Sequence, residues 1–364
     1  TPFESRNVLA CILAKDLGAK KTLARINNDE YFKKAYKPKF IELGVDEIIY
    51  PETLAANEIV ASVKQPASRV THEFSGGKLV LSGIKIRDNA TIVNKTLEEI
   101  GKFSSSFRVV AITRGDSTII PYGKDQLMPD DIAYFVSTPA ALSELYEKTG
   151  KDYFGVKNIM ILGGSRIAQK TAEKLSDQFN IKIIDVDKER CQQIADKFSN
   201  VLVINGDGRN LELLKEEGIE KMDAFVAVTG NSETNILTCQ LAKKMGVKRT
   251  VAEVENIDFI SLAEQVGIGS VINKKFIAAS FIYRFSMSSE ISSVKCLSST
   301  DAEAVEVIAH PGSKVTTDLI RNIDFPKEAK IGGIIREDQG IIATGDTQIV
   351  AGDKVVILDR KSVV

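Results

Sequence analysis

The sequence contains few of the residues on which metal sites, disulfide frameworks and acid–base catalysis depend. Its 364 residues include no tryptophan, four scattered cysteines and only two histidines, His72 and His310. Because there is no C-x-x-C motif and no cluster of cysteine with histidine, we expect neither a zinc site nor disulfides, and a reducing cytoplasm is favoured. Two histidines also leave few groups for proton transfer near neutral pH.

Long apolar runs and a strong net charge are also absent. The longest apolar candidate, residues 276–285, is shorter than the roughly 20 residues of a bilayer-spanning helix and contains Arg284. The formal net charge is -1, so charge gives no argument for binding to nucleic acid, and no nucleic-acid partner is expected. With 43% apolar residues, the chain has the composition of a soluble globular protein, and its length allows two or more domains.

The most informative stretch is a glycine-rich turn between two apolar runs. Residues 158–162 (NIMIL) predict a buried strand, residues 166–178 a helix, and residues 181–184 a second strand that ends in Asp185. The turn itself reads Gly163-Gly164-Ser165-Arg166-Ile167-Ala168. This order of strand, turn, helix and strand is typical of the opening of a dinucleotide-binding fold.

The turn predicts a phosphate site of imperfect form. Gly163 permits the tight turn, and the small Ala168 lets the helix pack on the strand, while the free N–H groups at the helix start favour an anion. Ser165 stands where this pattern usually has its second glycine. Its side chain crowds the phosphate, but its hydroxyl can donate a hydrogen bond. The alternative is a turn that serves packing alone.

Polar residues follow three further strands at the edge where a ligand would lie. Asp185 is placed to accept from ribose hydroxyls and to repel a 2′-phosphate, which favours NAD over NADP, with Asp187 as the competing choice. Asp207 follows the third strand in a Gly-Asp-Gly turn, and Thr229 and Gly230 follow the fourth. The alternatives to ligand contact are that these acids are solvent-exposed loop residues and that the Gly-Asp-Gly sequence only forms a turn. We expect Glu233 and Asn235 to cap the next helix.

The chain repeats itself over a long period. Residues 1–30 align with residues 229–258, residues 43–49 align with 266–272, and Gly123 and Asp131 fall over Gly345 and Asp353. The sequence therefore predicts a duplication. The first copy lacks its opening strand and glycine-rich turn, so we expect the natural protein to extend upstream of Thr1. Arg25 aligns with Glu253, which predicts two chemically different sites.

Each copy has two parts of different pattern. Strands near 158–162, 181–184, 201–204, 224–228, 249–254 and 270–272 alternate with helices and predict a parallel sheet. Short β-rich runs in 78–137 and 305–359, with one helix at 95–100 or 317–321, predict a mostly antiparallel sheet. The predicted class is α/β, with Rossmann-like domains alternating with small α+β domains, duplicated. The predicted domains are 1–68 (a partial Rossmann-like domain), 69–150, 151–288 and 289–364.

This combination of motifs resembles the TrkA family of Trk potassium uptake systems, whose members carry tandem RCK (regulator of potassium conductance) modules. The resemblance lies in ILGGSRIAQKTAEKL, IIDVDKER, the stretch from Asn205 to Ile236, and residues 302–320 and 331–337. It implies a cytoplasmic regulatory subunit, peripheral on the inner face of the membrane, that binds NAD(H), with ATP and ADP as further candidates. It also implies a tetrameric ring beneath a potassium-translocating subunit of the TrkH or TrkG kind.

The same resemblance implies the nucleotide contacts. In the second half they are Gly163, Gly164, Ser165, Arg166, Ile167, Asp185, Thr229, Gly230 and Glu253, and in the first half Thr1, Pro2 and Arg25. We expect no catalytic role. The alternative is an NAD-dependent oxidoreductase with a β-rich substrate domain, which needs an acid or base such as His310 or a lysine. We expect both histidines to be loop or surface residues. A sensor for some other partner is the third hypothesis.

Overall fold

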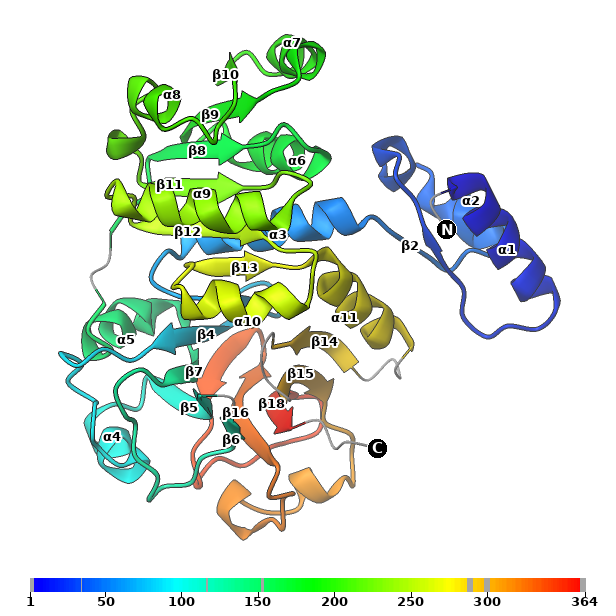
Figure 1. The fold of residues 1–364 in the computed structure, drawn as a ribbon. Coiled ribbons are helices and arrows are strands. Elements are labelled where there is room, and N and C mark those ends of the chain that lie inside the picture. The colour runs from blue at the N-terminus through cyan, green and yellow to red at the C-terminus, as the bar shows by residue number, and fades with distance from the viewer. Residues whose placement is uncertain are drawn as a thin grey trace.

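The chain folds into three large sheets and one small one, as a computed structural model shows for residues 3–33, 35–115, 117–151, 154–286, 291–297 and 302–360 (Figure 1). The α-helices are α1 (Glu4–Asp16), α2 (Lys37–Glu42), α3 (Pro51–Lys64), α4 (Leu97–Phe103), α5 (Leu142–Lys148), α6 (Arg166–Leu175), α7 (Lys188–Lys197), α8 (Leu211–Glu216), α9 (Ser232–Lys244), α10 (Asp258–Gln265) and α11 (Lys274–Ser286). The strands are β1 (Leu23–Arg25), β2 (Glu47–Ile49), β3 (Val70–Phe74), β4 (Leu79–Lys85), β5 (Phe107–Arg114), β6 (Ser117–Ile119), β7 (Ile132–Ser137), β8 (Asn158–Leu162), β9 (Asn180–Asp185), β10 (Val201–Asn205), β11 (Ala224–Ala227), β12 (Arg249–Glu253), β13 (Ser270–Ile272), β14 (Ile291–Cys296), β15 (Ala302–Ile308), β16 (Ala329–Arg336), β17 (Gln339–Ile342) and β18 (Lys354–Arg360). None of the helices in these ranges is long and apolar enough to cross a membrane.

The six-stranded sheet is parallel throughout and has the order β10-β9-β8-β11-β12-β13. Its central strands are apolar on both faces because helices cover both, as the runs NIMIL and AFVA predict. The strand order reverses beside β8, and in such sheets a ligand binds in the crevice outside the carboxyl ends of the strands at that point. The predicted Rossmann-like sheet and its six strands are confirmed.

The two five-stranded sheets are antiparallel and share one topology, which confirms the predicted fold class and duplication. Their orders, β3-β4-β7-β5-β6 and β14-β15-β18-β16-β17, place corresponding strands identically. Each sheet also repeats one ion pair: Arg114 donates two hydrogen bonds to Asp131 at 2.8 Å, and Arg336 donates two to Asp353 at 2.8 and 2.7 Å. Burial alone would raise the pKa of Asp353, but the hydrogen bonds from Arg336 and the Val350 N–H hold it below its usual range.

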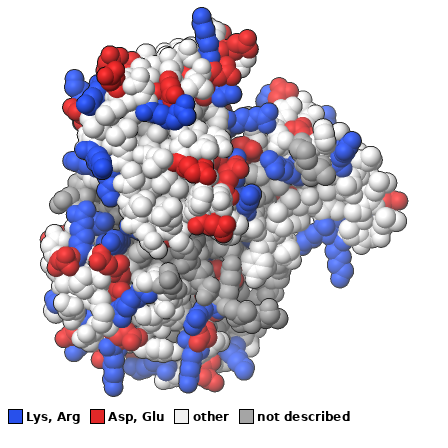
Figure 2. All heavy atoms as spheres, in the orientation of Figure 1, with Lys and Arg blue, Asp and Glu red and all other residues white. Residues whose placement is uncertain are grey.

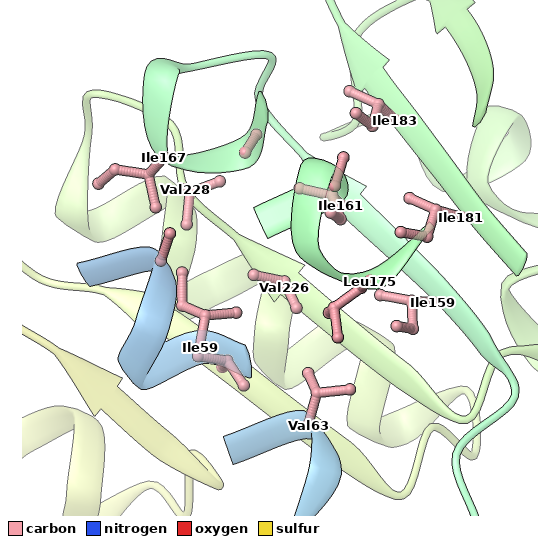
Figure 3. Packing of buried hydrophobic residues seen from close by; sticks show 14 of the residues in the cluster. Ile59, Val63, Ile159, Ile161, Ile167, Leu175, Ile181, Ile183, Val226 and Val228 are labelled. Carbon is pink, nitrogen blue, oxygen red and sulfur yellow. The ribbon is translucent and has the colours of Figure 1, made fainter. Parts of the chain in front are cut away.

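Helix α3 of the first half packs against the second half. This helix follows the small β1–β2 pair of the first half, yet its apolar face packs into the core of the parallel sheet of the second half. Figure 3 shows Ile59 and Val63 of α3 beside Ile167 and Leu175 of α6, over the strand residues Ile159 and Val226. Figure 1 shows that the elements before α3 lie to one side of this sheet; they are α1, β1, α2 and β2.

Two expectations about local structure are wrong. Residues 317–321 do not form a helix; short 3₁₀ turns at Lys314–Thr316 and Ile320–Asn322 lie there instead, and β-branched and polar residues around them favour such turns over a helix. His72 is not a loop or surface residue. It lies in β3, half-buried between the two antiparallel sheets, and its Nε2 lies 2.8 Å from Ser293 Oγ of β14.

The packing of α3 yields a stability prediction. Ile59 is fully buried between α6 and the parallel sheet, so Ile59→Ala should lower the free energy of unfolding by about 2–5 kcal/mol through lost apolar burial and the cavity it leaves. Ile41→Ala is the matched control, because Ile41 on α2 is 50% exposed and should change stability by no more than about 0.5 kcal/mol. Urea denaturation of both variants measures the difference. Equal effects would mean that α3 is not part of the core.

Candidate functional site

A cavity of about 370 Å³ lies at the carboxyl ends of β8, β9 and β11, where the strand order reverses. Its walls come from the loops that follow four neighbouring strands. The lining residues are Leu162, Gly163, Ser165, Ile184, Asp185, Val186, Arg190, Asp207, Gly208, Arg209, Val228, Thr229, Gly230, Asn231 and Thr234. Six residues proposed from the sequence therefore meet around one cavity: Gly163, Ser165, Asp185, Asp207, Thr229 and Gly230.

The glycine-rich turn requires glycine at its first position and is closely packed at its second. Gly163 has φ of +96°, and a Cβ there would lie 3.0 Å from the Thr229 backbone nitrogen and from the Val228 carbonyl. A Cβ on Gly164 would lie 2.7 Å from Ile194 Cδ1 of α7. The sequence therefore uses Gly163 for a left-handed turn against β11 and Gly164 for close contact with α7. Both hold the start of α6 at the rim of the cavity.

The first turn of α6 offers free backbone donors to this cavity. Ser165 is the N-cap, and its Oγ accepts from the Ala168 N–H at 3.4 Å. The N–H groups of Arg166 and Ile167 have no acceptor among the described residues, as helix geometry requires for a first turn. Ser165 thus caps the helix and faces the cavity at once. A phosphate here would receive N–H groups and the positive end of the helix dipole.

Arg166 and Ile167 are not among the residues that line this cavity, and neither is Gly164. The Arg166 side chain is exposed and lines a separate groove that faces Phe3, Leu9 and Tyr31. The Ile167 side chain is buried in the core between α6, α3 and the sheet. A nucleotide contact from either residue would therefore have to come from its backbone N–H group, next to Ser165.

Asp185 organises the turn as much as it faces the cavity. Its carboxylate accepts from the Gly164 N–H at 2.5 Å and the Asp187 N–H at 2.8 Å, and from Arg190 Nη1 at 3.0 and 3.3 Å. A carboxylate has about four lone-pair sites, so these bonds occupy most of its capacity. A ribose hydroxyl would therefore compete with Arg190 for this carboxylate. The competing choice, Asp187, is the N-cap of α7 and accepts from the Arg190 N–H.

Arg190 is the functional residue that sequence reasoning missed. It lines the cavity and pairs with Asp185 at 3.0 Å and with Asp187 at 3.3 Å, while its side chain stays 44% exposed. The sequence could have indicated this role, because Arg190 comes three residues after the N-cap Asp187 and therefore lies at the same end of α7. A guanidinium at this place is able to contact a phosphate or stack on a planar base.

The turns after β10 and β11 complete the wall. Asp207 forms an exposed two-bond pair with Arg209, whose hydrogen bonds hold the pKa of Asp207 below its usual range. The Thr229 hydroxyl donates to Asn235 Oδ1 at 2.6 Å. Gly230 has open space where a Cβ would lie, so its backbone borders the cavity without a steric requirement for glycine.

The expectation that Glu233 and Asn235 cap the helix after β11 is wrong. The N-cap of α9 is Asn231, whose Oδ1 accepts from the Thr234 N–H at 2.6 Å. Asn235 is fully buried and ties the Thr229 loop to β12, since it also donates to the Glu253 carbonyl at 2.8 Å. Several residues could cap this helix, and the sequence did not show which one comes first in the helical conformation.

The remaining proposed residues lie outside this cavity. Glu253 is buried at the end of β12 and pairs with Lys274 Nζ at 3.0 Å, and burial raises the pKa of its carboxyl although Lys274 opposes the shift. Arg25 ends β1 and pairs with Glu52 of α3 at 3.5 Å. The two aligned strand ends thus differ in charge: β1 ends in the cation of its ion pair, and β12 ends in the anion. Thr1 and Pro2 lie outside the described residues.

Charges of both signs are interspersed over the face in Figure 2. The described residues that line the cavity after β8, β9 and β11 include no histidine, lysine, cysteine or tyrosine. His310 is exposed in the loop after β15, as expected, and His72 lies in the first antiparallel sheet. The site therefore combines a glycine-rich turn with acids, two arginines and apolar walls.

Comparison with known proteins gives the family. Residues 159–274 match the TrkA-N domain and residues 81–150 the TrkA-C domain. The chain is 31% identical over 373 residues to Trk system potassium uptake protein TrkA homolog 2 of Methanosarcina mazei, with 100% of this chain and 83% of that protein covered. In fold it is similar to the GsuK RCK domain, at a TM-score of 0.58 and 14% identity, over 98% of this chain and 76% of that one. The GsuK channel bound to NAD is similar too, at a TM-score of 0.57 and 15% identity, over 98% and 63%. The chain belongs to the TrkA family of Trk system potassium uptake proteins.

Proposed function

We propose that this chain is a nucleotide-sensing regulatory subunit of a potassium uptake system, and that its cavity beyond β8, β9 and β11 binds NAD(H). The observation that carries the proposal is the first turn of α6: two N–H groups without an acceptor stand beside Gly163 at the reversal of the strand order. This is the arrangement that binds a pyrophosphate in dinucleotide-binding folds. A similarly folded protein, the GsuK channel, has been solved with NAD.

The size of the cavity suggests which part of the ligand it holds. At about 370 Å³ it is near the lower end of the roughly 300–1,000 Å³ typical of ligand sites. It therefore suits an adenosine and its phosphates, with the rest of a dinucleotide extending outward. NAD(H), ATP and ADP share this portion, so ATP and ADP are further ligands of the proposal. Asp185 and Asp207 disfavour an added 2′-phosphate.

The proposed role is regulation rather than catalysis. Hydride transfer needs a proton donor or acceptor beside the reacting ring, and the alternative oxidoreductase reading relied on His310 or a lysine. The described lining contains neither residue type. The two arginines of the lining, Arg190 and Arg209, do not lose their proton near neutral pH, and the carboxylate of Asp185 is already engaged by Arg190 and the turn.

The partners and location follow from the family. The proposal places the chain on the cytoplasmic side of the membrane, peripheral to a potassium-translocating subunit of the TrkH or TrkG kind, as part of a tetrameric ring. A ligand shifts such an assembly only if it binds two conformations with different affinity. The four-domain division at 1–68, 69–150, 151–288 and 289–364 belongs to the same proposal, with Glu253 as a further nucleotide contact of the second half and Arg25 as one of the first half.

A side chain at Gly230 tests the cavity directly. Because a Cβ there meets open space, Gly230→Val should leave the fold intact, fill part of the cavity and weaken NADH binding at least about tenfold, or roughly 1.4 kcal/mol. Gly155→Val is the matched control, since Gly155 also has open space around its Cβ and lies away from the cavity. Titration calorimetry with NADH measures both variants. Undiminished binding in Gly230→Val would place the nucleotide elsewhere.

Asp185→Ala tests the ribose side of the site. The substitution removes the acceptor for the Gly164 N–H and releases Arg190, so NADH affinity should fall at least about tenfold. Asp196→Ala, on the exposed face of α7, removes an acid that does not line the cavity and should leave affinity unchanged. Both affinities are measured by fluorescence titration with NADH. If the two variants behave alike, Asp185 has no part in the site.

Regulation is tested with the membrane subunit itself. Potassium uptake into proteoliposomes that hold the translocating subunit should change when this chain is added, and NADH should shift the rate further. Gly230→Val should keep the first effect and lose the second, because only the ligand response needs the cavity. Uptake that is indifferent to the wild-type chain would contradict the regulatory role.

A further inference from the structure

A second cavity, of about 690 Å³, lies where the two halves of the chain meet. Its walls are α3 and β3 from the first half and α11 and β14 from the second, the corresponding elements of the duplication. Figure 1 shows α11 beside β14, with α3 behind the parallel sheet next to them. This interlobe cavity shares no lining residue with the cavity beyond β8, β9 and β11.

Two polar atoms in its wall lack hydrogen-bond partners in the described part of the chain. Thr71 is 7% exposed, and its Oγ1 is buried without a donor or acceptor. Gln65 Oε1, at the end of α3, is in the same condition. A buried polar atom without a partner costs roughly 1–3 kcal/mol, so this wall is unfavourable as it stands and would gain from a rearrangement that gives these atoms partners. Both residues line the interlobe cavity.

The residues that line the interlobe cavity carry an excess of positive charge. They include four basic side chains, Lys64, Lys174, Arg284 and Lys295, and two acidic ones, Glu58 and Glu73, so two positive charges are in excess. His72 adds none, because burial and the nearby Lys295 and Arg284 lower its pKa to about 3. The excess equals the charge of a phosphate monoester, about -1.5 to -2 at neutral pH.

Aromatic side chains stand next to these cations. Phe276 and Phe281 of α11 line the cavity, and the Arg284 guanidinium lies 5.0 Å from the centre of the Phe281 ring. Arg284 also donates to the Ser292 carbonyl at 3.3 Å, while Lys295 pairs with Glu58 across the halves at 2.5 Å. One wall thus offers a planar apolar face, and the adjoining wall offers charge-assisted donors.

We propose that the interlobe cavity binds an aromatic phosphate monoester. Its phosphate lies toward Arg284 and Lys295, and its ring packs on the phenylalanines of α11. Since α3 and α11 belong to different halves, an occupant that touches both helices favours one spacing of the halves. The site does not depend on the proposed nucleotide function.

The experiment uses titration calorimetry on the full chain carrying Gly230→Val, which weakens binding at the other cavity. AMP and phenyl phosphate are the two probes, and adenosine and inorganic phosphate are their partial counterparts. At least one monoester should bind with one site per chain, and its counterparts should bind at least about tenfold more weakly. Binding of AMP alone identifies a nucleotide source, and binding of both identifies the broader class.

Three variants locate the binding. Arg284→Gln removes the charge and Ser280→Trp fills the cavity, so each should weaken the monoester at least about tenfold. Lys275→Gln removes a charge from α11 outside this cavity and should leave binding unchanged. The proposal is overturned if neither monoester binds, if adenosine binds as tightly as AMP, or if Arg284→Gln and Ser280→Trp bind as the parent does.

Discussion

The packing of α3 on α6 is the interaction on which the rest of the structure depends. Ala55, Ala56, Ile59 and Val63 of the first half are fully buried in the core of the parallel sheet of the second. The same core contains Ala168, Ala172 and Leu175 of α6, the helix whose first turn borders the nucleotide cavity. Neither half could be separated from the other without exposing this core to water. The halves therefore form one unit, and the phosphate-binding helix rests on a helix from the opposite half.

This arrangement connects the proposed ligand to the proposed regulation. A phosphate at the start of α6 would act on a helix that packs on α3. Helix α3 in turn carries Glu52, which pairs with Arg25 at the end of β1. On the other side, Glu253 pairs with Lys274 at the start of α11, and α11 contacts α3. Close-packed interiors change between discrete arrangements rather than deform continuously. The two ion pairs thus join the ends of β1 and β12 to α3 and α11, the two helices that contact each other between the halves.

The sequence predicted those features that local patterns control. Buried parallel strands read as short apolar runs, and Gly163 and Asp185 stood at fixed positions relative to them, so the sheet and the cavity wall could be located. Contacts between distant segments could not be. Nothing in the pattern of α3 says that its apolar face packs on the second half, and nothing around His72 says that β3 meets β14. Arg190 was missed, and Asn235 was given the wrong role, because their roles depend on which neighbours they reach in space.

Hydrogen exchange at the backbone amides tests the central claim most directly, because it reports the turn and α3 in one experiment. With saturating NADH, the account predicts slower exchange in residues 163–168, where the N–H groups of Arg166 and Ile167 gain an acceptor, and also in α3 (Pro51–Lys64), which packs on that helix. Exchange in exposed α2 should not change. Protection confined to the turn would contradict the coupling of the halves through α3, and an absence of any protection would contradict the nucleotide site itself.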